Sequence, residues 1–319
     1  MELTPKRIYE EVTKKNLDIS SAFKMLSSII ENSSNEDVRI ESFKVLEKIG
    51  VIDNKSYKFI ENLLISDSSW EIRNAAAYCL TEKFQNRAIQ PLKWAIKYEE
   101  IYECLITIIN SFVKLKTQES KQILIDEVKK IKKRKYLFSD AKVMNKLFKK
   151  QLKELFKNRK IEDFTHMELA DIIINYKTII ALKKNFFNVY YELENGKVIK
   201  LDLSDVEFEV RGWKSEFNNN IQDLLDIPGL KNLKHLKYLY LSNNHISNIK
   251  ALLELPNLSH LYISKNMLVE KQNIEYIKQM ANQNHLRYIN ISGNKIVNQI
   301  VIQEFNPKLE IIMKTPFYF

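Results

Sequence analysis

Three short segments of the chain place aromatic or polar side chains at alternate positions between leucines and isoleucines. In an extended strand, neighbouring side chains point to opposite faces, so the apolar residues face a core and the residues between them face outward. Clustered exposed tyrosines are typical of binding surfaces, because each offers a large contact area with few rotatable bonds. We therefore predict a partner-binding face made of Tyr238, Tyr240, His260, Tyr262, Tyr288 and Asn290.

Corresponding side chains of successive segments should form columns, because parallel strands lie about 4.8 Å apart. We expect Tyr238, His260 and Tyr288 in one column, and Tyr240 with Tyr262 in a second. The serines that follow these positions, and one earlier strand, should extend the face with Ser242, Ser264, Ser292, Lys200, Asp202 and Ser204. The alternative interpretation is that stacked aromatic rings only stiffen the sheet.

A basic segment is the second feature with binding chemistry. Residues 129–160 contain 14 Lys or Arg and two acidic residues, a net charge of +12 in a chain whose total is +10. Within it, Met144, Phe148 and Leu152 keep to one helical face, while lysines spaced by 3 or 4 residues follow another. The predicted polyanion-binding candidates are Lys132, Lys133, Arg134, Lys142, Lys146, Lys149, Lys153 and Lys157.

Three kinds of partner suit such a lysine ridge, namely nucleic-acid phosphate, an anionic membrane surface and an acidic protein. A solvated surface helix is the fourth interpretation. Lysine greatly outnumbers arginine in the segment and few aromatic residues are interspersed. This composition favours non-specific electrostatic attraction over the reading of bases.

Residue types used in catalysis do not form recognisable sites in this sequence. The five histidines show no pairing with metal-ligand spacing. Cys79 lies on an alanine-rich apolar helix face, which indicates a buried and unreactive thiol. The five glycines form no Gly-rich phosphate loop. We therefore predict a protein that is not an enzyme, with no catalytic residues, no metal and no cofactor.

The composition limits the broad class of the protein. A chain of 319 residues can bury two cores or one extended solenoid core. Its two cysteines favour a reducing compartment over a disulfide framework. We expect no signal peptide, since Met1–Lys15 is charged throughout, and no membrane span, since no stretch approaches ~18 uninterrupted apolar residues. The predicted location is the cytoplasm.

A repeated leucine spacing organises the second half of the chain. The pattern Leu-x-x-Leu-x-Leu-x-x-Asn-x-Ile begins at Leu236 and returns, with Ile or Leu at some positions, at Leu258 and Leu286. It resembles the leucine-rich-repeat family, and its first interval of 22 residues resembles the subfamily with short helical turns on the convex side. The resemblance implies a parallel sheet and an inward ladder of asparagines that bind main-chain groups of the next repeat, here Asn244, Asn266 and Asn294.

Three positions depart from the regular repeat. The second interval is 28 residues long, so we expect a helix inserted over residues 270–283. The strand over residues 197–203 is followed by Val206, where the pattern would place an asparagine. We also expect a last strand over Leu309–Met313.

The first half of the chain has helical apolar spacing nearly throughout. Asp67–Leu80 combines an acidic start, Arg73 and a run of alanines, and a second helix follows from Arg87. This arrangement resembles the HEAT-repeat family. The resemblance implies that small alanines let paired helices approach closely, and that Asp and Arg residues tie adjacent turns together. The next helix pair, over residues 101–131, keeps the pairing and lacks that Asp and Arg.

We predict an α-solenoid of HEAT-like helical repeats over residues 1–185, followed by an α/β solenoid, a short leucine-rich-repeat array with a parallel sheet, over residues 186–319. The first functional hypothesis is a non-catalytic scaffold or adaptor that binds one or more proteins through its repeat surfaces. The second is a nucleic-acid-binding protein that uses the basic segment. The third follows from resemblance to HEAT-like DNA glycosylases, because Trp70 lies in a stretch similar to theirs, although the sequence indicates no acidic, aromatic pocket to complete such a site.

Overall fold

The computed structural model describes residues 4–50, 52–133, 139–186, 188–206, 221–283, 286–296 and 308–313. Contacts within the chain define two compact units. The first unit is Met1–Asp126 with Thr165–Ala170, and the second is Glu127–Phe164 with Asp171–Phe319. The boundary predicted at residue 185 is one between helical repeats and leucine-rich repeats, not between units defined by contacts. It stays a prediction.

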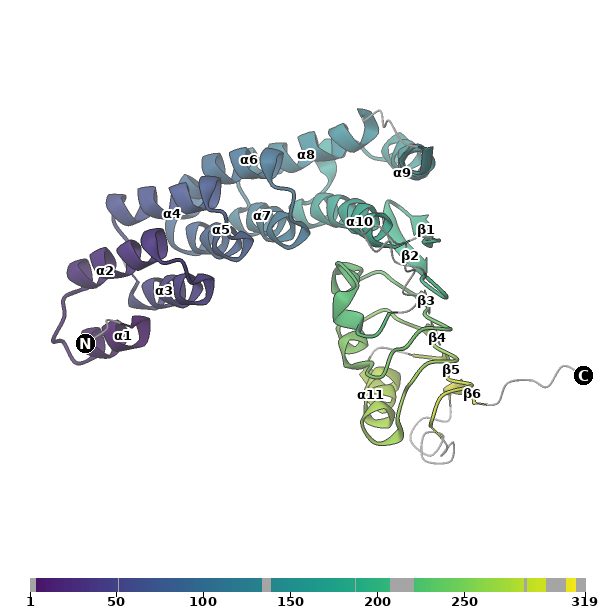
Figure 1. The fold of residues 1–319 in the computed structure, drawn as a ribbon. Coiled ribbons are helices and arrows are strands. Elements are labelled where there is room, and N and C mark those ends of the chain that lie inside the picture. The colour runs from purple at the N-terminus through teal and green to yellow at the C-terminus, as the bar shows by residue number, and fades with distance from the viewer. Residues whose placement is uncertain are drawn as a thin grey trace, which may run out of the picture. The chain divides into compact units, whose positions relative to one another are not determined.

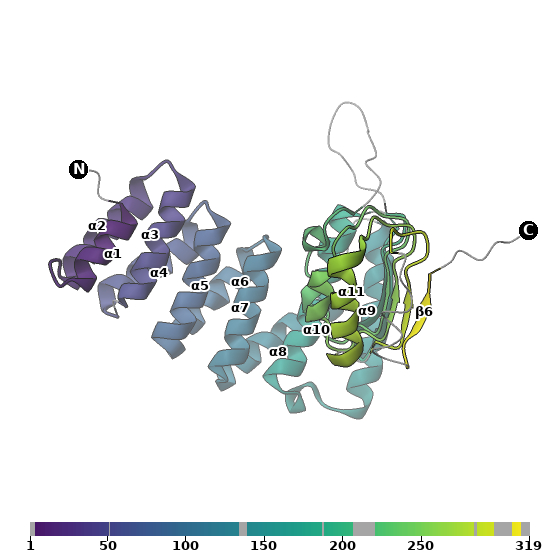
Figure 2. The same cartoon turned by 90° about the horizontal axis from the view of Figure 1, so that it is seen from below.

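The first unit is a run of helices in two layers, and the predicted α-solenoid is confirmed. Helices α2, α4 and α6 form one layer and α3, α5 and α7 the other (Figure 1), and successive helices lie side by side (Figure 2). The elements are α1 Pro5–Thr13, α2 Ile19–Asn32, α3 Glu36–Ile49, α4 Asn54–Ser66, α5 Trp70–Phe84, η1 Gln85–Ala88, α6 Ile89–Tyr98, α7 Tyr102–Leu115 and α8 Gln118–Lys133, which belongs to the second unit from Glu127 on.

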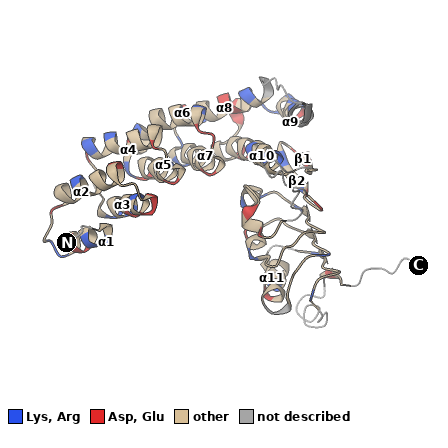
Figure 3. Ribbon diagram, in the orientation of Figure 1, with Lys and Arg blue, Asp and Glu red and all other residues tan. Residues whose placement is uncertain are grey.

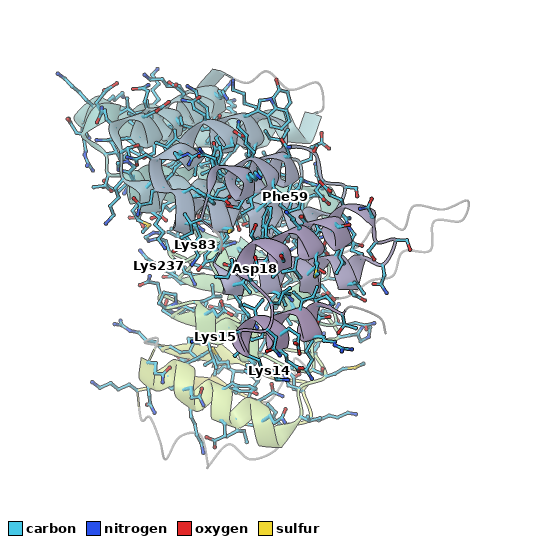
Figure 4. The ribbon with its side chains drawn as sticks, turned by 90° about the vertical axis from the view of Figure 1, so that its left-hand side faces the viewer. Lys14, Lys15, Asp18, Phe59, Lys83 and Lys237 are labelled. Atoms are coloured by element: carbon cyan, nitrogen blue, oxygen red, sulfur yellow. The ribbon has the colours of Figure 1, made fainter. Side chains whose placement is uncertain are left out.

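The first five helices of this unit begin where a short polar side chain accepts a backbone N–H of the first turn, whereas α6 and α7 have no side-chain cap. The capping residues are Thr4, Asp18, Asn35, Asp53 and Ser69. Asp18 is labelled at the start of α2 in Figure 4. Helix α3 ends at Gly50, whose φ of 72° lies in the left-handed region that glycine adopts without a steric penalty.

Helix α5 lies at the centre of the first unit and is buried on two sides. Ile72, Ala76 and Leu80 are almost fully buried, as the helical spacing predicts. In the run of alanines, Ala75 is only partly buried and Ala77 is fully buried. The difference arises because α5 packs against both α4 and α7, so it has no single buried stripe.

Two arginines tie consecutive repeats of the first unit together. Arg39 donates from Nε to the carbonyl oxygen of Ile30 and from Nη2 to Asp67, at 2.6 and 2.5 Å. Arg73 donates to the carbonyl oxygen of Asp67 and, through two nitrogens, to both carboxylate oxygens of Glu99 at 2.7 and 3.0 Å. The repeat that contains α7 and α8 lacks the expected Asp, but it is still linked to the preceding repeat by an ion pair with Arg73, because Glu99 occupies the position of that Asp.

The carboxylate of Glu99 is strongly stabilised in its charged form. Burial alone would raise the pKa of Glu99, since only 5% of its side chain is exposed. Hydrogen bonds from Arg73 and from the backbone N–H of Ile101 outweigh that effect and lower the pKa to about 2. The tie between these repeats thus depends on an ionised carboxylate.

The second unit contains a six-stranded sheet in the order β1-β2-β3-β4-β5-β6. Strands β2 to β6 are parallel, and β1 pairs antiparallel with β2. The elements are α9 Ser139–Asn158, η2 Ile161–Asp163, α10 His166–Asn185, β1 Tyr190–Glu194, β2 Lys197–Asp202, η3 Leu224–Asp226, η4 Leu230–Asn232, β3 Tyr238–Tyr240, η5 Lys250–Glu254, β4 His260–Tyr262, α11 Glu270–Gln283, β5 Tyr288–Asn290 and β6 Glu310–Ile312. No helix in the described ranges is both long enough and apolar enough to cross a bilayer.

The predicted leucine-rich-repeat solenoid is confirmed in its repeat geometry. Short 3-10 turns return the chain along the side opposite the strands, and α11 fills the long interval where a helix was expected. The strands place Leu201, Leu239, Leu261, Ile289 and Ile311 in register. Each of these side chains is nearly or fully buried, so one apolar column forms the core behind the sheet.

The asparagine ladder holds the rungs in register. The Oδ1 of Asn266 accepts the N–H of Ile246 in the preceding repeat, and its Nδ2 donates to the carbonyl oxygens of Leu241 and Ile263. Asn244 and Asn294 make equivalent bonds in their own repeats. The predicted structural role of the three asparagines is confirmed.

The first end of the sheet is closed by a hairpin and two helices. Asn195 and Gly196 both have positive φ, 53° and 75°, as the tight turn between β1 and β2 requires. The Oδ1 of Asn175 in α10 accepts the N–H of Val198 in β2. An asparagine from a helix thus makes, for the first parallel strand, the kind of bond that the ladder asparagines make in later repeats. Phe148 of α9 is fully buried and packs edge-to-face on Tyr176, at 5.1 Å between ring centroids.

Replacing Glu99 by Gln should lower the free energy of unfolding by roughly 3 kcal/mol at pH 7, because Arg73 would lose its charged partner in a largely buried place. The folded pKa lies below the ordinary value of 4.5, so this contribution is complete above pH 4.5 and is lost as the pH falls toward 2. Denaturant unfolding of both proteins between pH 7 and pH 2.5 measures the difference. The exposed neighbour change Glu100→Gln should cost less than about 0.5 kcal/mol. A difference that stays constant over this pH range would contradict the assignment.

Candidate partner-binding face on the parallel sheet

Strands β3, β4 and β5 bring together the side chains that the alternation of residues predicts on one face. Tyr238, His260 and Tyr288 are direct neighbours across successive strands. Tyr240 and Tyr262 are neighbours in the next row, which continues with Asn290. All six side chains are partly exposed, whereas the residue between each pair is fully buried.

Five aromatic rings of this face form a continuous chain of contacts, here called the aromatic ladder. Tyr240 and Tyr262 stack with their centroids 4.2 Å apart and their planes within 2°. Tyr238 lies 4.6 Å from His260, which lies 5.9 Å from Tyr288. Tyr262 also contacts Tyr288 at 4.9 Å. The residues predict two separate columns, and this diagonal contact joins them into one surface.

The rings of the ladder desolvate one another. Burial raises the pKa of Tyr262 to about 12, with further contributions from the hydroxyl and charge of Tyr240. Burial also raises the pKa of Tyr288, and the negative charge of Glu310 adds to the effect. The phenols of Tyr262 and Tyr288 therefore remain neutral hydrogen-bonding groups at physiological pH.

His260 is the titratable group at the centre of the ladder. Burial lowers the pKa of His260, the positive charge of Arg287 lowers it further, and the negative charge of Glu310 opposes both. Its Nδ1 lies 2.9 Å from the hydroxyl of Ser259. The imidazole between Tyr238 and Tyr288 is consequently neutral at pH 7 and acts as an aromatic ring.

Charged residues border the ladder on its β2 side. The Nζ of Lys200 lies 2.9 Å from Glu192 and 5.4 Å from the centre of the Tyr240 ring. Lys237, labelled in Figure 4, forms an ion pair of 3.1 Å with Glu194. Asp202 lies beside Tyr240 in register. The acidic residues of β1 were not anticipated, because that strand lies outside the leucine pattern.

The β6 side of the ladder is bordered by Glu310, the direct neighbour of Tyr288. The sequence indicated a strand over Leu309–Met313, and β6 lies within that range, but Glu310 was not named as a member of the face. Alternation along the strand would have placed it there, since Leu309 and Ile311 are buried on either side of it.

The serines Ser242, Ser264 and Ser292 were predicted on the same exposed face, and two of the three are partly exposed there. Ser264 donates to Ser242 at 3.0 Å, and both side chains are partly exposed. Ser292 was expected on the open face and is buried, because its hydroxyl turns to the side-chain oxygen of Asn290 at 2.8 Å.

The basic segment lies on α8, α9 and the residues after them (Figure 3). On α9, Lys146, Lys153 and Lys157 are exposed and Lys149 is partly exposed. The apolar face of α9 is confirmed at Phe148 and Leu152, which are fully buried, whereas Met144 lies outside the described side chains. Lys132, Lys133 and Lys142 lie in helices, and their side chains are outside the described ones; Arg134 lies outside the described residues altogether.

The two cysteines are buried. Burial is the largest cause that raises the pKa of Cys79, to about 12, and it also raises the pKa of Cys104. Neither thiol is therefore a thiolate at neutral pH. Among the described residues, no group of three His, Cys, Asp or Glu side chains is arranged to hold a metal ion.

Comparison with protein families finds both kinds of repeat. The family model described as HEAT repeat matches residues 57–82, and the one described as Leucine Rich repeats (2 copies) matches residues 234–276. No curated protein matches the chain. The N-terminal part is therefore HEAT-like and the C-terminal part is a leucine-rich-repeat array, as their residues indicated. Repeats of both kinds are commonly found in protein-interaction scaffolds.

The charges around His260 generate a testable order of pKa values. The imidazole should titrate below its ordinary value of 6.5. Arg287→Gln should raise this pKa, because a repelling positive charge is removed, and Glu310→Gln should lower it, because an attracting negative charge is removed. The Cε1–H resonance of His260, followed by NMR across pH 4–8 (~0.1 M salt), measures all three. Lys250→Gln, in the turn η5, is the charge-matched control and should leave the value unchanged. A pKa at or above 6.5, or insensitivity to both changes, would overturn this description.

Proposed function

We propose that this protein is a non-catalytic protein–protein interaction scaffold whose aromatic ladder binds a partner. The observation that carries the proposal is the chain of five contacting rings, each of which remains partly exposed on strands whose inward residues, Leu239, Leu261 and Ile289, are fully buried. Contiguous aromatic surface of this kind is costly to leave in water and is typical of interface hot spots.

The rigidity of the ladder supports the same proposal. Each ring is held by its neighbours, so binding would cost little side-chain entropy. The phenol hydroxyls and the partly exposed Ser242 and Ser264 offer polar groups beside the rings, and interfaces combine apolar anchors with such groups. The alternative, that the rings only stiffen the sheet, predicts a loss of stability without a loss of binding when they are removed.

Replacing Tyr240 and Tyr262 together by Ala should abolish capture of the partner from a cell lysate, because the tightest ring contact would be lost. The melting temperature should fall by no more than a few degrees, since an aromatic pair contributes about 1 kcal/mol beyond its buried area. Affinity capture with nuclease treatment and thermal unfolding measure the two effects. A double change of two exposed tyrosines of the first unit, Tyr78→Ala with Tyr98→Ala, controls for lost aromatic surface. Unchanged capture by the Tyr240/Tyr262 variant would remove the proposal.

A second candidate function is the binding of polyanions, foremost nucleic acid, by α9. The supporting observation is that Lys146, Lys153 and Lys157 are exposed while Phe148 and Leu152 on the same helix are fully buried. The helix therefore presents positive charge to solvent from Lys146 to Lys157. Contacts of lysine with phosphate release counterions, so their contribution depends steeply on salt.

Replacing Lys146, Lys153 and Lys157 by Glu should remove any shift of DNA in gel electrophoresis. In the unchanged protein, log K should fall with log salt by about 0.9 for each phosphate neutralised. A variant in which three exposed lysines of other helices, Lys24, Lys44 and Lys97, become Glu carries the same net charge. If both variants shift DNA like the unchanged protein, the lysine ridge is a solvated surface. If both lose the shift equally, net charge rather than α9 is responsible.

A further inference from the structure

One end of the aromatic ladder already carries a cation. Lys200 extends over the ring of Tyr240, 5.4 Å from its centroid, and its ammonium group pairs with Glu192 at 2.9 Å. The ring face on the β2 side thus has an ammonium group held between it and a carboxylate. This arrangement combines a cation–π interaction with a charge-assisted hydrogen bond.

The other end of the ladder repeats this arrangement, and the described residues supply no cation there. Tyr288 of β5 stacks on His260 of β4, and β6 is the neighbour of β5 on the other side. Glu310 is the direct cross-strand neighbour of Tyr288, and its side chain is exposed. Among the described residues, no Lys, Arg or His side chain forms an ion pair with Glu310. A ring face and a carboxylate therefore lie side by side at this end.

The balance of charge around the ladder favours a positive partner. Glu192 and Glu194 are paired with Lys200 and Lys237, at 2.9 and 3.1 Å. Asp202 and Glu310 lie on opposite sides of the ladder, and within the described part of the chain neither has a salt-bridge partner. The exposed Arg287 lies near enough to affect His260, but it forms no ion pair with either of them there. The strands themselves carry more acidic than basic residues, in contrast to the net charge of +10 of the whole chain.

We propose that the partner segment bound by this face carries a lysine or arginine that lies between the ring of Tyr288 and the carboxylate of Glu310. The inference rests on the proposed function and specifies the chemistry of its partner. An extended segment that crosses the strands from Asp202 to Glu310 would span four strand intervals, about 19 Å, or roughly six residues. A partner with basic residues in such a segment would form ion pairs with both carboxylates, neither of which has a salt-bridge partner among the described residues.

The test uses acetyl-hexaarginine amide as the probe and the full chain with ring-labelled tyrosines. Hexacitrulline of the same length has nearly the same shape without the charge, and is the matched control peptide. Binding at this place should move the ring resonances of Tyr288, assigned with Tyr288→Phe, at low salt. Glu310→Gln should weaken the effect at Tyr288 by at least threefold, whereas Glu254→Gln, which removes the same charge from the turn η5, should not. The resonances of Tyr240 and Tyr262 without peptide report whether the variants fold.

The outcomes separate this inference from the proposed function. No movement of Tyr288 with hexaarginine, equal movement with hexacitrulline, or equal affinity in Glu310→Gln would each overturn the cation site. In those cases, loss of partner capture by the Tyr240/Tyr262 variant would still support the scaffold. If that variant keeps its partner while hexaarginine moves Tyr288 in a Glu310-dependent way, the cation site is supported and the scaffold proposal fails.

Discussion

Hydrogen bonds between consecutive repeats are the constraint on which both units depend. A single repeat cannot bury its own polar turn, so each turn is completed by the next repeat along the chain. In the second unit an asparagine amide carries out this task, since Asn266 binds main-chain groups of two rungs. In the first unit the guanidinium of Arg73 does so, because it binds the carbonyl of one turn and the carboxylate of the following one. Register is therefore fixed by polar groups, whereas the cores supply most of the burial.

The aromatic ladder follows from that register. Because the asparagines fix each rung against the next, residues at equal positions in the repeats must be neighbours, and rings at those positions must touch. Ring spacing then follows the spacing of strands, as the 4.2 Å stack of Tyr240 on Tyr262 shows. A slip of one residue would turn these rings into the core. The same bonds that stabilise the fold thus create the surface that we propose as functional.

Much of this architecture could be predicted from residue spacing alone. The repeated asparagines, the alternation in the strands and the extra helix α11 all follow from local rules that need no tertiary information. The contact of Tyr262 with Tyr288 could not, because it depends on how far two rings on different strands lean toward each other. The role of Glu99 was hidden because a glutamate takes the position between two helices that the repeat pattern gives to an aspartate, as Asp67 does one repeat earlier. Ser292 is buried although alternation placed it outward, and its hydroxyl donates to the side chain of Asn290. Side-chain partners at short range, rather than the pattern of apolar residues, decided each of these cases.

Strands β3, β4 and β5 are each three residues long, with one side chain inward and two outward. The inward residue is always Leu or Ile, so the apolar interior is identical from rung to rung in kind. Folding therefore depends on the inward residue of each strand, and binding on the two outward residues. Substitution of the two outward residues of one strand leaves the apolar core unchanged. A new binding specificity can therefore arise by changes of two side chains per strand, without changes in the core.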